Sequence, residues 1–144
     1  MKKIARTAFI YAIAAMIFGV IYREGSKFLE LTTRTNWSIV HTHLFVLGML
    51  FFLIVLLIEK NFNITKDKKF NMFYMIYNTG LILTTIMLWI RGIAQITNNV
   101  PTMYDKMISG VSGIGHILLS VGMILFFAIL MKIITKEKNQ TNEK

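Results

Sequence analysis

The side chains best suited to chemistry in this sequence are three histidines, His41, His43 and His116, each set within or beside a long apolar stretch. Neutral imidazole is a common ligand of transition metals and of haem iron. A polar group at membrane depth is costly, and such residues usually serve a function. The histidines are therefore the first candidates for a cofactor or metal site.

His43 and His116 are predicted to lie at the same depth. His43 precedes the charged residue Glu59 by sixteen positions, and His116 precedes Lys132 by the same number. At a helical rise of about 1.5 Å per residue, both lie roughly 24 Å from that charged border. If their helices are diagonal neighbours in a bundle, the two imidazoles could ligate one haem iron from both sides.

Cations and small residues near these histidines fit the same hypothesis. Arg91 lies twenty-two residues beyond Lys69, which places it roughly 33 Å from the charged border. Arg91 and Arg23 are therefore expected near the opposite membrane interface, where they would bind the haem propionates. The glycines expected to leave room for the macrocycle are Gly48, Gly113, Gly115 and Gly122.

His41 and His43 raise an alternative, because they are only two residues apart. On a regular helix such residues point about 200° apart and cannot both face one site. If the helix began only after His43, the two imidazoles could join His116 in a three-histidine zinc or copper site. Other polar residues in the spans are expected to form interhelical hydrogen bonds; they are Asn78, Thr84 and Thr85.

Acidic residues and cysteine bear on what the chain cannot do. No Asp or Glu lies within the apolar stretches, which disfavours a paired-carboxylate hydrolase and a proton-coupled carrier with a mid-membrane acid. Cysteine is absent, which excludes disulfides and thiolate metal sites. No complete catalytic constellation is visible, so the sequence favours a redox or binding protein over a hydrolase and leaves enzymatic activity open.

The hydropathy pattern supplies the elements that position these residues. The chain has 144 residues, of which 55% are hydrophobic, and its mean hydropathy is +0.58. A membrane-spanning helix needs about 20 apolar residues, and four stretches qualify, at 4–22, 37–58, 70–96 and 107–131. We expect an all-α, integral membrane, up-down-up-down four-helix bundle over residues 1–134. The tail at 135–144 is expected to be disordered.

Lys and Arg are divided unequally between the two sides of such a bundle. Eleven of the 16 lie in the N-terminus, the 59–69 loop and the C-terminal tail, and five lie on the other side. The richer side is predicted to be cytoplasmic, so both termini should face the cytoplasm of a multi-pass cell-membrane protein. The net charge of +9 then reflects topology, and nucleic-acid binding is not expected.

Residues 37–48, Trp-Ser-Ile-Val-His-Thr-His-Leu-Phe-Val-Leu-Gly, resemble the His-bearing second helix of the haem–copper oxidase superfamily and its small relatives. The whole chain resembles short, four-span bacterial membrane proteins of unassigned function. The first resemblance implies that His41 or His43 is an axial ligand of a low-spin haem. The chain has far fewer spans than the catalytic oxidase subunit and lacks the histidines of a copper centre, so oxygen reduction by this chain alone is not expected.

Together these patterns favour a b-type haem-binding membrane protein. The haem would lie between the second and fourth spans in the outer half of the membrane, for electron transfer or for haem handling or sensing. The alternatives are a three-histidine zinc or copper protein and a cofactor-free accessory subunit. Expected partners are the lipid bilayer and a membrane redox partner or quinone, and a homo-oligomer stays open.

Overall fold

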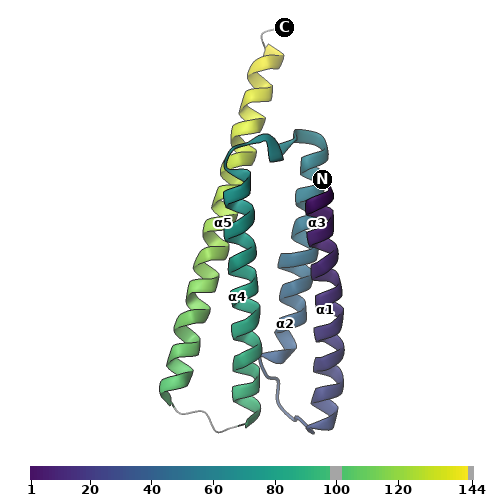
Figure 1. The fold of residues 1–144 in the computed structure, drawn as a ribbon, viewed down its shortest axis with the longest axis vertical. Helices are drawn as coiled ribbons and strands as arrows, with labels where there is room; N and C mark the ends of the chain where they lie inside the picture. The colour runs from purple at the N-terminus through teal and green to yellow at the C-terminus, as the bar shows by residue number, and fades with distance from the viewer. Residues whose placement is uncertain (98–101, 143–144) are drawn as a thin grey trace.

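The computed structural model describes residues 1–97 and 102–142, and this part of the chain contains helices and no strand (Figure 1). Four helices are long and apolar enough to cross a membrane. Three of them are α1 (Lys2–Phe28), α4 (Phe70–Thr97) and α5 (Thr102–Asn142). The remaining one, Trp37–Phe62, is here called helix two. The predicted all-α four-helix membrane bundle is confirmed.

The helices begin near the predicted positions, but three of them extend further than predicted. Helix two continues to Phe62, where the predicted span ended at residue 58. α1 continues to Phe28, and α5 continues through 135–142, where the sequence predicted a disordered tail. That prediction is wrong for the backbone of residues 135–142; residues 143 and 144 lie outside the described residues. Four of the eight residues at 135–142 are Lys, Glu or Gln, which are good helix formers. Extending an existing helix also requires no new nucleation.

Helix two is continuous but not uniform. It consists of α2 (Trp37–His43), the π-helical segment η1 (Leu44–Leu50) and α3 (Phe51–Phe62). The wider π turn changes which side chains face each neighbour. Within η1, the Leu47 carbonyl oxygen accepts a hydrogen bond of 2.9 Å from the Tyr77 hydroxyl of α4. Short π segments inside α-helices frequently occur at functional sites, and this one directly follows His43.

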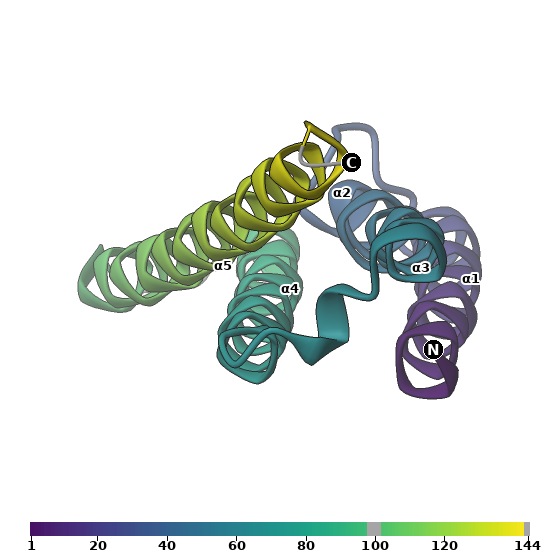
Figure 2. The same cartoon turned by 90° about the horizontal axis from the view of Figure 1, so that it is seen from above.

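The helices pack in the order α1, helix two, α4 and α5 (Figures 1 and 2). α1 contacts all three segments of helix two, and helix two contacts α4 mainly through α2. α5 lies along α4 and also touches the 3₁₀ turn η2 (Ile64–Lys66), but it does not pack extensively on helix two within the described residues. Helix two and α5 are therefore separate neighbours of α4.

An aromatic cluster fills the middle of the bundle. The rings of Phe51 and Tyr77 stack with centroids 4.4 Å apart, and Phe51 also meets Phe126 of α5 at 5.4 Å. Phe52 lies 5.7 Å from Tyr77 and 5.9 Å from Tyr11 of α1. These rings connect all four helices, so they define the core of the bundle.

The end of the bundle that carries the N-terminus and the 63–69 loop is stabilised by two carboxylates. Buried Glu59 accepts hydrogen bonds from the backbone N–H and the hydroxyl of Thr65, at 2.8 and 2.6 Å. Asp67 accepts a hydrogen bond of 2.6 Å from Lys132 Nζ of α5 and another from the backbone N–H of Lys69. These contacts hold the pKa of Asp67 below its usual range and tie α5 to the loop. We call this the basic end, and the opposite one the far end.

Glycines set the distance between α4 and α5. A Cβ atom added to Gly115 would lie 2.5 Å from the Thr84 hydroxyl and 3.0 Å from the Thr84 backbone nitrogen. A Cβ on Gly122 would lie 2.9 Å from Tyr77 Cβ, and one on Gly80 would lie 2.7 Å from the Leu119 backbone nitrogen. Close backbone approach through small residues is a usual way for helices to associate in lipid.

Gly115→Leu should therefore destabilise the bundle by about 1–3 kcal/mol through overpacking. The matched control is Gly113→Leu, because a Cβ at Gly113 meets nothing within 4 Å. Both substitutions replace a helical glycine of α5, so they share the same gain in helix propensity. Unfolding in detergent, followed by circular dichroism, measures the difference. Equal stability of the two variants would contradict the close approach of α4 and α5.

Candidate functional site

The rings of His43 and His116 are held in the same way. His43 Nδ1 lies 2.9 Å from the Ile39 carbonyl oxygen, and His116 Nδ1 lies 2.8 Å from the Ser112 carbonyl oxygen. A carbonyl oxygen only accepts, so Nδ1 carries the proton and donates it in both bonds. The Nε2 lone pair of each ring is then free to bind a metal ion. Metal-ligating histidines are usually oriented by such a bond from the other ring nitrogen.

His116 borders a cavity of about 430 Å³, here called the His116 cavity. Leu47 of η1 and Tyr77 of α4 line it from one side. The other lining residues come from α5, and they are Leu119, Ser120, Met123 and Ile124. His43 does not line this cavity, but it precedes Leu47 by four residues, about one turn of helix. The cavity is therefore lined by residues of helix two, α4 and α5.

His41 lies on a different side of helix two from His43. Its ring stacks on Tyr22 of α1, with centroids 6.1 Å apart and an interplanar angle of 19°, and a Cβ on Gly19 would lie 3.9 Å from it. The buried Nδ1 of His41 has no hydrogen-bond partner in the described part of the chain. The predicted divergence of the two neighbouring imidazoles is thus confirmed, and His41 faces α1.

The three histidines do not form one group. Among the described residues, no set of three or more His, Asp or Glu side chains comes together to hold a metal ion. The condition for the three-histidine alternative was a helix that begins after His43, whereas helix two begins at Trp37 and continues through both histidines. The zinc or copper alternative therefore gains no support from this arrangement.

α2, which carries two of the histidines, is anchored on α4 by a tryptophan. The indole of Trp37 stacks on Trp89 with centroids 4.6 Å apart, and its Nε1 donates to the Trp89 carbonyl oxygen at 3.3 Å. Gly92 makes room for this ring, because a Cβ there would overlap Trp37 Cδ1. The start of helix two is thereby fixed against α4 at the far end.

The two arginines expected near a haem lie at the far end as well. Arg23 is within the last two turns of α1, is exposed, and pairs with Glu24 at 3.6 Å. Arg91 is within the last two turns of α4 and is half-buried. Both are thus on the far side of the histidines from the basic end, as predicted from the residue count.

Gly48 does not have the role expected of it. A Cβ at Gly48 would lie 2.5 Å from Tyr11 Cγ, so this glycine permits the close approach of α1 and helix two. Gly115 and Gly122 likewise face α4. The expectation that these three glycines leave room for a macrocycle is wrong, because residues of a neighbouring helix fill the space beside each of them. Gly113, with open space around it, is the exception.

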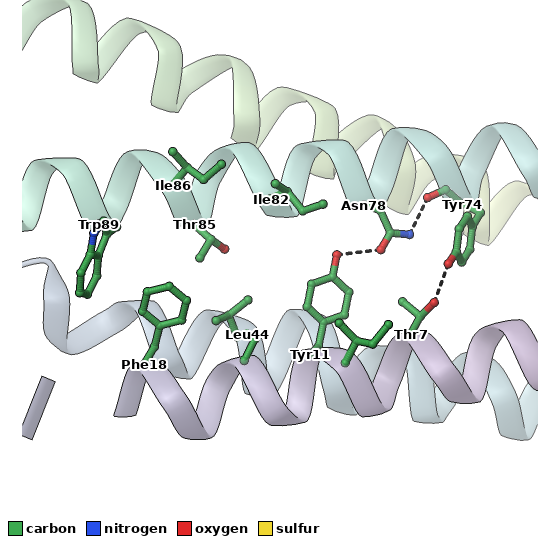
Figure 3. Close-up of a pocket in the computed structure, with 12 residues that line it drawn as sticks. Thr7, Tyr11, Phe18, Leu44, Tyr74, Asn78, Ile82, Thr85, Ile86 and Trp89 are labelled. Atoms are coloured by element: carbon green, nitrogen blue, oxygen red, sulfur yellow. Dashed lines mark hydrogen bonds between the residues drawn. The ribbon is translucent and has the colours of Figure 1, made fainter. Parts of the chain in front are cut away.

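A larger cavity that the sequence did not predict lies between α1 and α4 (Figure 3). It has a volume of about 540 Å³ and is here called the α1/α4 groove. Its lining residues are Thr7, Ile10, Tyr11, Ala14, Phe18, Leu44, Tyr74, Asn78, Ile82, Thr85, Ile86 and Trp89. The sequence carried one signal for it, since Thr7 and Tyr11, and Tyr74 and Asn78, are polar pairs spaced by four residues.

The predicted interhelical hydrogen bonds are present for only one of three residues. Asn78 Oδ1 accepts a bond of 2.7 Å from the Tyr11 hydroxyl across the groove, which confirms that prediction. Thr85 instead donates to the Leu81 carbonyl oxygen of its own helix. The buried Thr84 hydroxyl has no hydrogen-bond partner among the described residues, and it lies beside Gly115.

The comparison with known proteins identifies a family but no function. Residues 1–133 match the model of a family described as "Protein of unknown function (DUF2871)". The chain belongs to this family. No curated protein and no solved structure matches the chain. The expectation of an uncharacterised family is confirmed, whereas the resemblance of residues 37–48 to haem–copper oxidases has no support from the match and stays a prediction.

Proposed function

We propose that this DUF2871 protein binds a b-type haem in the membrane, with His43 and His116 as its two axial ligands. The observation that carries the proposal is the matched orientation of the two rings. Each imidazole donates its Nδ1 proton to the carbonyl oxygen four residues earlier, so the Nε2 lone pair of each ring would be the atom that binds iron. His41 is left out, because its ring faces Tyr22 and α1.

The space between helix two and α5 supports the same proposal. The His116 cavity opens there, and its lining is apolar apart from His116, Ser120 and the Tyr77 hydroxyl. α5 packs on α4 rather than on helix two, so a flat apolar group could enter between the two histidine helices. Arg23 and Arg91 at the far end would bind the haem propionates.

Two axial imidazoles occupy both open positions of a haem iron, which suits electron transfer better than gas binding. The chain itself would provide the ligands, the apolar walls and the cationic end of the site. The second candidate, haem handling or sensing, shares this site. The resemblance of residues 37–48 to the oxidase helix implies a low-spin haem, which agrees with two histidine ligands.

We further infer that the basic end faces the cytoplasm. Lys2, Lys3 and Arg6 of α1 lie there with the 63–69 loop and Lys132 of α5. The excess of Lys and Arg at one end is the usual signal for a cytoplasmic side. The haem would then lie in the outer half of the cell membrane.

Haem binding is tested by the spectrum of protein purified after expression with a haem precursor. The wild-type chain should show a Soret band, with sharp α and β bands on reduction. His43→Ala and His116→Ala should each abolish these bands, because loss of one axial ligand removes half of the attachment. His41→Ala is the matched control and should keep the wild-type ratio of haem to protein.

Three outcomes would contradict the proposal. Wild-type spectra in both His43→Ala and His116→Ala would show that the haem is held elsewhere. A bound metal ion without a Soret band would favour the three-histidine site. The absence of both haem and metal from supplemented preparations would favour a cofactor-free accessory subunit.

Topology is tested separately with introduced cysteines, which is simple because the chain has none. Thr33→Cys in the loop between α1 and helix two should react with a membrane-impermeant maleimide in intact cells. Lys68→Cys in the loop before α4 should react only after lysis. Both residues are exposed, so accessibility depends on the side of the membrane. The reverse labelling pattern would refute a cytoplasmic basic end.

A further inference from the structure

The α1/α4 groove has a polar end and an apolar end (Figure 3). Near the basic end, the Thr7 and Tyr74 hydroxyls lie 2.5 Å apart, and the Tyr11 hydroxyl donates to Asn78 Oδ1 at 2.7 Å. Toward the far end the walls are formed by aliphatic side chains, by the rings of Phe18 and Trp89, and by Thr85, whose hydroxyl donates to the Leu81 carbonyl oxygen of its own helix. This gradient fits a ligand with one polar end and a long apolar chain.

The length and position of the groove fit a lipid-soluble molecule. Thr7 and Phe18 are eleven residues apart on α1, which corresponds to roughly 16 Å along the helix. That is about half of a hydrocarbon core of about 30 Å, so the groove covers the depth of one leaflet. Ile10, Ile82 and Ile86 are half exposed at its edges, which leaves the groove open to the bilayer.

The lining indicates an uncharged ligand. All of the residues that line the groove are neutral. Lys3 Nζ lies 3.8 Å above the Tyr74 ring, but Lys3 is not part of the lining. None of the lining side chains would pair with a phosphate or a propionate, and burying such a charge without a partner is very costly. The neutral lining therefore fits an uncharged occupant better than a haem or the headgroup of a phospholipid.

On each helix, two polar residues of the groove are spaced like the two oxygens of a quinone ring. Thr7 and Tyr11, and Tyr74 and Asn78, are each separated by four residues, or roughly 6 Å along the helix axis. This is close to the separation of the two oxygens on opposite corners of a quinone ring. Hydroxyl and amide groups both donate and accept, so the same pairs could bind the oxidised and the reduced ring. With a plain acyl chain in the groove, Thr7 and Tyr74, and Tyr11 and Asn78, would simply keep their bonds to one another.

Aromatic rings connect the groove with the His116 cavity. Tyr11 lies in the lining of the groove and stacks on Phe52 at 5.9 Å, and Phe52 lies 5.7 Å from Tyr77. Tyr77 in turn lines the His116 cavity. The two cavities are thus separated by three rings in contact. The choice of a redox-active rather than an inert neutral lipid rests on the proposed haem function.

We propose that the α1/α4 groove binds an isoprenoid quinone or quinol. The ring lies between α1 and α4 with its two oxygens at the Thr7–Tyr74 and Tyr11–Asn78 pairs, and the chain runs past Ala14 toward Trp89. On binding, the tyrosine hydroxyls turn from their present partners to the ring oxygens. The groove is then the place where this membrane protein meets its lipid-soluble redox partner.

Binding is measured by quenching of tryptophan fluorescence when decylubiquinone is added to the full chain in lipid nanodiscs. Trp89 lines the groove and Trp37 stacks on it, so both indoles report on the site. We expect saturable quenching. Ala14→Phe should abolish the saturable phase by filling the groove, whereas Ala128→Phe, at an exposed alanine of α5, should leave it unchanged. Tyr11→Phe removes only one hydroxyl and should raise the dissociation constant about fivefold.

Two further arms separate this inference from the haem proposal and from simple lipid binding. The haem-deficient variant His116→Ala should bind decylubiquinone as tightly as the wild type, so a failure of haem binding does not affect this measurement. Decanol, which has a chain and no ring, should not compete. Quenching that never saturates, that is equal in Ala14→Phe and Ala128→Phe, or that decanol removes would overturn the quinone site.

Discussion

The close approach of α4 and α5 determines where this bundle has room for a ligand. Gly80, Gly115 and Gly122 bring the two backbones together, and each would clash with the neighbouring helix if it carried a Cβ atom. In lipid the helices gain no hydrophobic energy from meeting one another, so packing of this kind decides which pairs associate. Because α5 packs along α4, it does not cover helix two, and the His116 cavity forms between helix two and α5.

A second close approach has the same effect on the other side of the bundle. Gly48 brings α1 against helix two at Tyr11, and Trp37 fixes the start of helix two against α4. α1 and α4 then both pack on helix two without packing closely on each other. The α1/α4 groove is the space that remains, and the Tyr11–Asn78 and Thr7–Tyr74 pairs bridge it. Both cavities thus follow from which helix pairs are drawn together.

The sequence was sufficient for features that depend on one helix at a time. The four spans follow from length and hydropathy, and the divergence of His41 and His43 follows from the angle between residues two apart. Apart from the interhelical hydrogen bond of Asn78, features that depend on two helices were not predicted. The sequence shows that Gly48 leaves space beside its helix, but it does not show that Tyr11 of α1 fills that space. The helices expose large apolar residues on several faces, so hydropathy does not mark the packed side of each.

The distinction between one helix and two also applies to the histidine site. The bonds from His43 to Ile39 and from His116 to Ser112 lie within single helices, so each ring is oriented by its own backbone before the bundle assembles. An imidazole N–H in apolar surroundings must find an acceptor, and the preceding turn is the nearest one. What the bundle adds is the separation between the two rings, which is set by the course of α5 along α4. Packing of α5 is therefore coupled to the site, although the glycines that control it face Thr84 and Tyr77 rather than any ligand.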